Sequence, residues 1–137
     1  MIGLDTNVLI RYIVQDDPRQ AKKATRFIET RCTRDSPGFI NRVVLCEIVW
    51  VLESAYRFQP DQISSVIEKM LTTAEFIIEN LAEAVLALQV YKKQGIDFAD
   101  ALIGFINRNE GCSQTITFDQ KASRLDIFNL LVDESPL

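Results

Sequence analysis

Histidine is absent from this 137-residue sequence, and its absence excludes several common catalytic sites. Serine–histidine and cysteine–histidine nucleophile pairs need an imidazole, and so do most zinc hydrolase sites. Cysteine is scarce, and three widely spaced cysteines, an odd number, argue against a disulfide framework or a zinc site. We therefore expect any acid–base or metal chemistry in this protein to depend on carboxylates.

Long apolar runs and net positive charge are also missing. No apolar run reaches the roughly 18 residues that a membrane-spanning helix needs. An acid, Asp5, stands where a secretory signal peptide would have a basic region followed by a longer apolar segment. The net charge of −4 gives no general attraction to nucleic acid. We expect a soluble, cytoplasmic protein without a membrane partner, whose binding to any polyanion needs local basic patches or bridging cations.

The order of hydrophobic patterns indicates one α/β domain. A chain of 137 residues with 47% hydrophobic residues is enough for a single core. Strand-like and helix-like segments alternate, which predicts a parallel sheet. We place the domain at residues 1–132 and a C-terminal tail at residues 133–137. Strands are expected near 1–4, 39–40, 75–79, 115–118 and 128–132, and helices near 8–13, 18–34, 41–56, 60–72, 80–95 and from 97 and 120 onward.

Two aspartates occupy equivalent places in this pattern. Asp5 directly follows the first expected strand, and Asp119 directly follows a late one. In parallel α/β sheets the ligand-binding crevice lies beyond the carboxyl ends of the strands, so both side chains are site candidates. Each has an alternative role as a turn or N-cap residue, and this alternative stays open.

Glu47 is the most informative acid in the pattern. The helix expected from 41 to 56 has an apolar face formed by Val43, Val44, Ile48, Val51, Leu52 and Ala55. Glu47 falls on that face and is predicted to point inward. A buried carboxylate needs a cation, a hydrogen-bond partner or a strongly shifted pKa. An internal salt bridge with an arginine is the alternative.

A further pair of acids opens the helix that follows Gly95. Asp97 and Asp100 lie one helical turn apart, on one face with Gly104. Neighbouring like charges are better tolerated at a helix N-terminus, and better still around a divalent metal. Asp97 also has the form of an N-cap, whereas Asp100, flanked by apolar residues, does not.

Together these acids form an oxygen-only ligand set that suits the hard cations Mg²⁺ or Mn²⁺. The set is Asp5, Glu47, Asp97, Asp100 and Asp119. Such an ion binds a phosphate oxygen, generates hydroxide and stabilises the charge of a phosphodiester transition state. The neighbouring Thr6, Asn7 and Thr117 are candidates to orient the ligands or the attacking water, although they are equally explained as cap and strand residues.

The segments that carry these acids resemble the ordered acidic motifs of the PIN-domain family. They are residues 2–10 (IGLDTNVLI), the helix around Glu47, residues 97–104 (DFADALIG) and residues 117–121 (TFDQK). The resemblance spans residues 2 to about 131, and the short single-domain form is most similar to the VapC-type toxins of toxin–antitoxin pairs. It implies a PIN-like α/β fold with a central, mostly parallel sheet flanked by helices in three layers.

The same resemblance implies a function. The family is one of Mg²⁺- or Mn²⁺-dependent endoribonucleases that form homodimers and are inhibited by a cognate antitoxin inserted at the active site. By this resemblance Asp5, Glu47, Asp100 and Asp119 match the catalytic metal-site positions, with Asp97 as an additional acid nearby. We therefore expect hydrolysis of RNA phosphodiester bonds by metal-activated water.

Basic and aromatic residues supply further candidates. The RNA-binding candidates border the crevice and are Arg11, Arg42, Lys121 and Arg124. A basic stripe, Arg19, Lys22, Lys23 and Arg26, is best interpreted as the solvated face of an amphipathic helix. Trp50, Tyr56 and Phe58 are expected to pack in the core or to face a partner rather than to stack on bases.

Two other functions stay open. A phosphoacceptor, receiver-like signalling module is also α/β with carboxylates at strand ends, but here the first strand ends in one acid instead of two and no lysine ends the late strand. A non-catalytic PIN-like binding protein would keep the acidic pocket for structural reasons.

Overall fold

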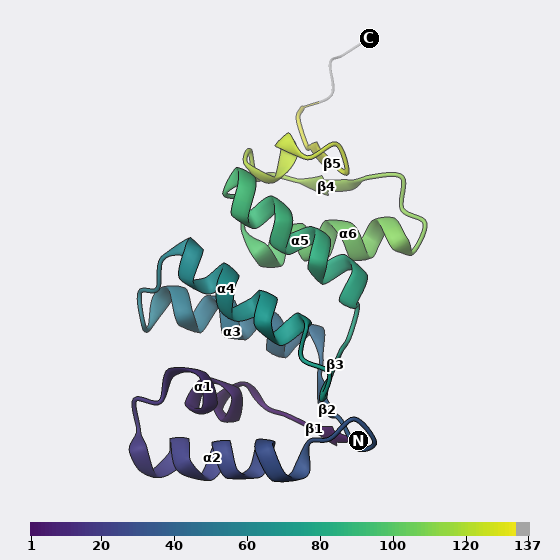
Figure 1. The fold of residues 1–137 in the computed structure, drawn as a ribbon. Helices are drawn as coiled ribbons and strands as arrows, with labels where there is room; N and C mark the ends of the chain where they lie inside the picture. The colour runs from purple at the N-terminus through teal and green to yellow at the C-terminus, as the bar shows by residue number, and fades with distance from the viewer. Residues whose placement is uncertain (134–137) are drawn as a thin grey trace. The chain divides into compact units, whose positions relative to one another are not determined.

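A computed structural model describes residues 1–133 of the chain (Figure 1). The expected C-terminal tail, residues 133–137, lies outside the described residues except for Asp133. The chain divides into two compact units, Met1–Leu81 and Ala82–Leu137. No helix in the described part of the chain is both long and apolar enough to cross a membrane.

The first unit contains a three-stranded parallel sheet with two pairs of helices. Its elements are β1 (Ile2–Gly3), α1 (Thr6–Val14), α2 (Pro18–Arg31), β2 (Gly38–Ile40), α3 (Arg42–Ser54), α4 (Pro60–Leu71) and β3 (Phe76–Ile78). The strand order is β1-β2-β3, with Ile2 opposite Gly38 and Gly38 opposite Phe76. Parallel neighbours need a crossover, and each crossover here is a helical pair, α1 with α2 and then α3 with α4.

Local sequence signals explain where the helices of this unit begin. The side chains of Asp17 and Asn41 accept backbone hydrogen bonds at the N-termini of α2 and α3. Pro18 and Pro60 occupy first-turn positions, where their missing N–H groups cost nothing. The core is aliphatic, and its most deeply buried side chains are Leu9, Ile40, Leu45, Ile48, Leu52, Ile63 and Ile67.

The second unit carries two helices and a two-stranded parallel sheet. Its elements are α5 (Leu81–Gln94), α6 (Phe98–Asn109), β4 (Thr115–Thr117), the short 3₁₀ helix η1 (Ala122–Arg124) and β5 (Phe128–Leu130). Thr115 of β4 lies opposite Phe128 of β5. The core contains Phe98, whose ring meets that of Tyr91 edge to face. Figure 1 shows β4 and β5 side by side, with α6 beneath them in this view.

Gly104 lets α6 approach β5 closely. A Cβ at this position would lie 2.7 Å from Phe128 Cζ and 2.8 Å from Ile127 Cδ1, so any larger residue would overlap the core. The glycine therefore serves packing, and it sets the distance between β5 and the helix that carries Asp100.

The sequence predicted the α/β class and the parallel strands, and both are confirmed. The strands are divided between a three-stranded and a two-stranded sheet, one in each unit. The buried Cys32 and the exposed Cys112 are free thiols, as the odd cysteine count indicated.

Candidate carboxylate sites

The first unit links two of the predicted acids through one threonine. Asp5 follows β1 and caps α1, where its Oδ1 accepts a hydrogen bond from the Thr6 amide at 2.7 Å. The buried Thr6 donates its hydroxyl to Glu47 Oε1 at 3.2 Å, from α1 to α3. Thr6 thus holds both carboxylates, one through its backbone and the other through its side chain. We call Asp5 and Glu47 the first carboxylate set.

The prediction that Glu47 points inward is wrong. Glu47 is exposed, and so are Val43 and Trp50 on the same side of α3. The buried face is formed by Val44, Leu45, Ile48, Val49 and Leu52. Nearly every residue from 43 to 52 is apolar, so two overlapping stripes satisfy the helical period, and packing buries the stripe that excludes Glu47. Glu47 therefore belongs to the first carboxylate set because it accepts a hydrogen bond from the Thr6 hydroxyl, and not because it is buried.

A hollow of about 790 Å³ lies beside Asp5, between β1, α1 and α2. Asp5 and Asn7 supply part of its polar lining, and Leu4, Val8 and Phe27 part of its apolar lining. Two cationic side chains, Arg11 and Lys23, also line it.

The second unit places two acids, Asp97 and Asp119, within electrostatic reach of Asp100. Asp97 caps α6 by accepting a hydrogen bond from the Asp100 amide at 3.0 Å. Asp119 accepts one from the Ala122 amide at 2.9 Å, and its own amide donates to Thr117 Oγ1 at 3.0 Å. The pKa of Asp100 is raised, first by partial burial and then by the charges of Asp97 and Asp119. We call Asp97, Asp100 and Asp119 the second carboxylate set.

The alternative interpretation as turn or N-cap residues is therefore correct, because Asp5 and Asp97 cap helices and Asp119 holds the turn after β4, but these roles leave acceptor positions for a cation. A carboxylate offers about four acceptor positions, and a cap occupies only one of them. Neighbouring carboxylates repel one another, and a hard divalent cation that binds their oxygens relieves this repulsion. Among residues 1–133, no three acidic or cysteine side chains already converge as a ready-made metal site.

Arg11, one of the RNA-binding candidates, is engaged in the fold. Arg11 Nη1 lies 3.1 Å from Asp16 Oδ1, and it donates to the Tyr56 hydroxyl at 3.2 Å. Tyr56 donates to Asp16 in turn, which lowers the pKa of Asp16. This network ties the end of α1 to the segment after α3, a role for Arg11 that the sequence did not indicate.

The remaining basic candidates are more open. Arg42 is half-exposed, with Nε 3.9 Å from Glu79 Oε1 and a long 3.4 Å hydrogen bond to Asn80. Lys121 and Arg124 are exposed beside Asp119 and form no ion pair within the described residues. Lys121 and Arg124 are therefore available to a polyanion beside Asp119, whereas Arg42 belongs to the first unit.

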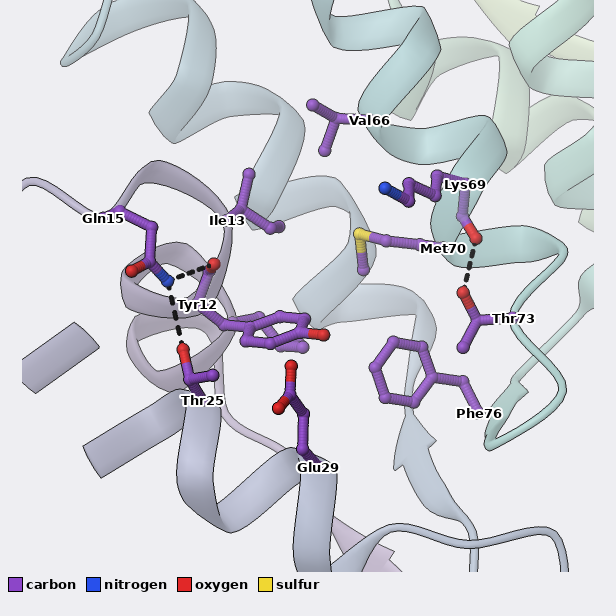
Figure 2. A pocket seen from close by; sticks show the side chains of 11 residues that line it. Tyr12, Ile13, Gln15, Thr25, Glu29, Val66, Lys69, Met70, Thr73 and Phe76 are labelled. Atoms are coloured by element: carbon purple, nitrogen blue, oxygen red, sulfur yellow. Dashed lines mark hydrogen bonds between the residues drawn. The ribbon is translucent and has the colours of Figure 1, made fainter. Parts of the chain in front are cut away.

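A second hollow in the first unit, of about 490 Å³, was not predicted. Figure 2 shows Tyr12, Met70 and Phe76 turned toward its middle, with the Glu29 carboxylate beside the Tyr12 ring. Burial raises the pKa of Tyr12, and the nearby Glu29 raises it further. This hollow contains no carboxylate of either set, and it forms only when α1, α2, α4 and β3 pack together, so no local sequence signal could have revealed it.

Comparison with known proteins gives a family match over most of the chain. The model of the family described as PIN domain matches residues 2–127, a span that includes all five predicted acids. A VapC ribonuclease from Aquifex aeolicus (strain VF5) is 24% identical over 122 residues, which cover 89% of this chain and 90% of that protein. No solved structure matches the chain significantly.

Proposed function

From the premise that this chain belongs to the PIN-domain family, we propose that it is a metal-dependent endoribonuclease, the toxin of a toxin–antitoxin pair. The observation that carries the proposal is the family match over residues 2–127, which includes both carboxylate sets. The similar protein from Aquifex aeolicus is named a VapC ribonuclease, and the match covers nearly its whole length. The receiver-like alternative finds no support in these comparisons.

The catalytic residues of this proposal are Asp5, Glu47, Asp100 and Asp119, with Asp97 as an additional metal ligand. The donor set supports Mg²⁺ or Mn²⁺ because it consists of carboxylate oxygens and lacks imidazole. The raised pKa of Asp100 adds support, since a nearby cation would offset the repulsion from Asp97 and Asp119. When bound, such an ion supplies Lewis-acid stabilisation of the phosphate charge and lowers the pKa of water.

The other residues hold the carboxylates in place. Thr6 fixes one oxygen of Asp5 with its amide and one oxygen of Glu47 with its hydroxyl. The Thr117 hydroxyl oxygen accepts a hydrogen bond from the Asp119 amide and so orders the turn after β4. Asn7 is exposed beside Asp5 and is available to the substrate or to water. Positioning of this kind is a general requirement for a metal-dependent hydrolase, because small displacements of ligands are costly.

The proposed partners follow the family. RNA is the substrate, and Lys121, Arg124 and Arg42 are the cations available to its phosphates. Arg11 is a weaker candidate because Asp16 and Tyr56 engage it. We further propose a cytoplasmic homodimer that a cognate antitoxin inhibits.

Two substitutions test the proposed function. Asp5→Asn and Asp100→Asn should each reduce cleavage of single-stranded RNA by roughly 10²-fold or more, because each removes a charged ligand while keeping its shape. Asn also remains a good N-cap, so Asp5→Asn should fold normally by circular dichroism. Asp35→Asn, at an exposed loop acid outside both sets, is the matched control. Undiminished cleavage by highly purified Asp100→Asn protein with Mn²⁺ present would refute the site assignment.

A further inference from the structure

Helix α1 is tied by hydrogen bonds at both of its ends to α3 and the segment that follows α3. At the N-terminal end, the Thr6 hydroxyl donates to Glu47 Oε1 of α3 at 3.2 Å. At the C-terminal end, Arg11 Nη1 donates to the Tyr56 hydroxyl at 3.2 Å, and this hydroxyl donates to Asp16 Oδ2 at 2.8 Å. All five residues belong to the first unit, and none of these contacts involves the second unit.

The C-terminal tie is a closed set of three bonds, which we call the Tyr56 triangle. Its third bond runs from Arg11 Nη1 to Asp16 Oδ1 at 3.1 Å. Bonds linked in this way polarise and orient one another. The Arg11–Asp16 pair joins α1 only to the turn that follows it, whereas both bonds to the segment after α3 pass through the Tyr56 hydroxyl.

Tyr56 is itself held against α3. Its amide donates to the Val51 carbonyl at 3.3 Å, and the Phe58 amide donates to the Leu52 carbonyl at 2.9 Å. The rings of Tyr56 and Phe58 meet edge to face, with centroids 6.2 Å apart. The hydroxyl therefore has a defined position relative to α3, from which it can place the end of α1.

The tie at the other end of α1 is sensitive to where the helix lies. O–H···O bonds cluster near about 2.7–2.8 Å, so the Thr6–Glu47 bond of 3.2 Å is close to the long end of the range. A small shift of α1 would break it. Burial of Leu9 and Ile10 holds α1 on the core, but apolar contact is not directional, and it fixes the rotation of a helix less sharply than hydrogen bonds do.

We propose that Tyr56 is a positioning residue of the first carboxylate set. Its hydroxyl fixes the C-terminal end of α1 against α3, and this placement keeps Thr6 where it bonds both Asp5 and Glu47. The inference rests on the proposed function, because it takes these carboxylates to be metal ligands. Tyr56 acts through α1 in this role and contacts neither the metal nor the RNA.

Tyr56→Phe isolates the proposed tie. It keeps the aromatic ring and the Arg11–Asp16 pair, and it removes both bonds that reach the segment after α3. The hydrogen bond from Tyr56 is the main cause of the lowered pKa of Asp16, so in this variant that pKa should return toward its ordinary value, measured by NMR. Tyr12→Phe is the matched control, because Tyr12 belongs to α1 but lies in the hollow of Figure 2 and takes no part in the triangle.

Mn²⁺ binding, measured by calorimetry on folded protein, tests the positioning role. Tyr56→Phe should bind Mn²⁺ roughly threefold more weakly than the wild type, a smaller loss than the tenfold or more that follows removal of a group bonded directly to a ligand. Tyr12→Phe should bind Mn²⁺ like the wild type.

A double-mutant cycle separates positioning from a general loss of stability. In a Thr6→Val background the Thr6–Glu47 bond is already absent, so adding Tyr56→Phe should weaken Mn²⁺ binding less than it does in the wild type. Thr6 and Tyr56 share no hydrogen-bond partner, and independent effects at such sites add. Non-additivity would therefore show that Tyr56 acts through the first carboxylate set.

The possible failures are distinguishable. Unchanged Mn²⁺ affinity in Tyr56→Phe, or an equal loss with and without the Thr6 hydroxyl, would overturn the positioning role and leave the proposed function standing. An Asp16 pKa that stays low in Tyr56→Phe would overturn the triangle on which the role depends. The expected non-additivity in a protein that never cleaves RNA would support the positioning role and reject the ribonuclease. A wild-type protein that binds no Mn²⁺ would reject both proposals.

Discussion

The two carboxylate sets differ in the interactions that their side chains make. In the first unit, Asp5 and Glu47 each accept a hydrogen bond from Thr6, and these bonds fix the positions of the two carboxylates. In the second unit, partial burial raises the pKa of Asp100, and the charges of Asp97 and Asp119 raise it further. Hydrogen bonds therefore prepare the first set, whereas the second set is left with repulsion that a cation would relieve.

This difference teaches that a carboxylate cluster can be assembled by two distinct means. A hydrogen-bonded set is ordered before anything binds, and its geometry depends on the donor. A mutually repelling set costs stability in the free protein and regains it when a cation binds. Loss of a hydrogen bond should therefore weaken the first set, whereas loss of a negative charge should stabilise the second set in the metal-free protein.

The largest expected effect comes from crowding the helix that carries Asp100. Gly104→Ala places a methyl group 2.7 Å from Phe128 Cζ, and such overpacking costs about 1–3 kcal/mol. Alanine returns about 1 kcal/mol through its better helix propensity. We expect a net loss of up to about 2 kcal/mol in the free energy of unfolding, measured by urea denaturation.

Hydrogen exchange shows where the Gly104→Ala effect falls. Faster exchange should be confined to α6 and β5 of the second unit. Gly38→Ala is the comparison in the first unit, where the nearest atoms, Leu4 Cδ1 and Cys32 Sγ, are ends of movable side chains and the cost should be smaller. Equal losses in the two variants would contradict the tighter packing assigned to Gly104.

An intermediate effect is expected at the residue that links the first set. Thr6→Val removes the hydroxyl that bonds Glu47 while keeping the shape of the side chain, which should lower stability by about 1 kcal/mol. Loss of this positioning should also weaken Mn²⁺ binding by roughly tenfold, measured by calorimetry. Thr6→Ser retains the hydroxyl and should bind Mn²⁺ like the wild type. If Thr6→Val bound Mn²⁺ normally, the hydrogen bond would not prepare the first set.

The smallest effect should be a gain in stability in the second set. The raised pKa of Asp100 means that the folded protein holds this proton more tightly than the unfolded chain does. With EDTA present, stability should therefore fall as the pH rises from the ordinary aspartate pKa through the raised value. Asp100→Asn should remove this slope and raise the unfolding free energy at pH 7 by no more than about 1 kcal/mol.

Without metal, Asp100→Asn should be the more stable protein. Added Mn²⁺ should make the wild type the more stable one, because it should raise the melting temperature of the wild type more than that of Asp100→Asn. Asp97→Asn keeps the cap on α6 and removes a neighbouring charge, so it should reduce the pH slope in part. A pH slope in Asp100→Asn equal to that of the wild type would show that the burial of Asp100 and its repulsion by Asp97 and Asp119 do not cause the slope.

Much of the fold could be predicted because its signals are local. Cap residues and prolines mark the starts of α2, α3 and α4, and short runs with aromatic or β-branched residues mark the strands. The positions of Asp5 and Asp119 directly after strands followed from the same local pattern. The orientation of Glu47 did not, because α3 is apolar on more than half of its circumference and its sequence permits two buried faces.

The sequence by itself determined the order of helices and strands, the oxygen-only chemistry of the acids and the motifs that place the chain in its family. These depend on residue type and on spacing over a few residues. Only the tertiary structure decided which stripe of α3 faces the core and that Thr6 joins Asp5 to Glu47. Each of these depends on contacts between elements far apart in the chain, since packing selects one face among several that the helical period allows.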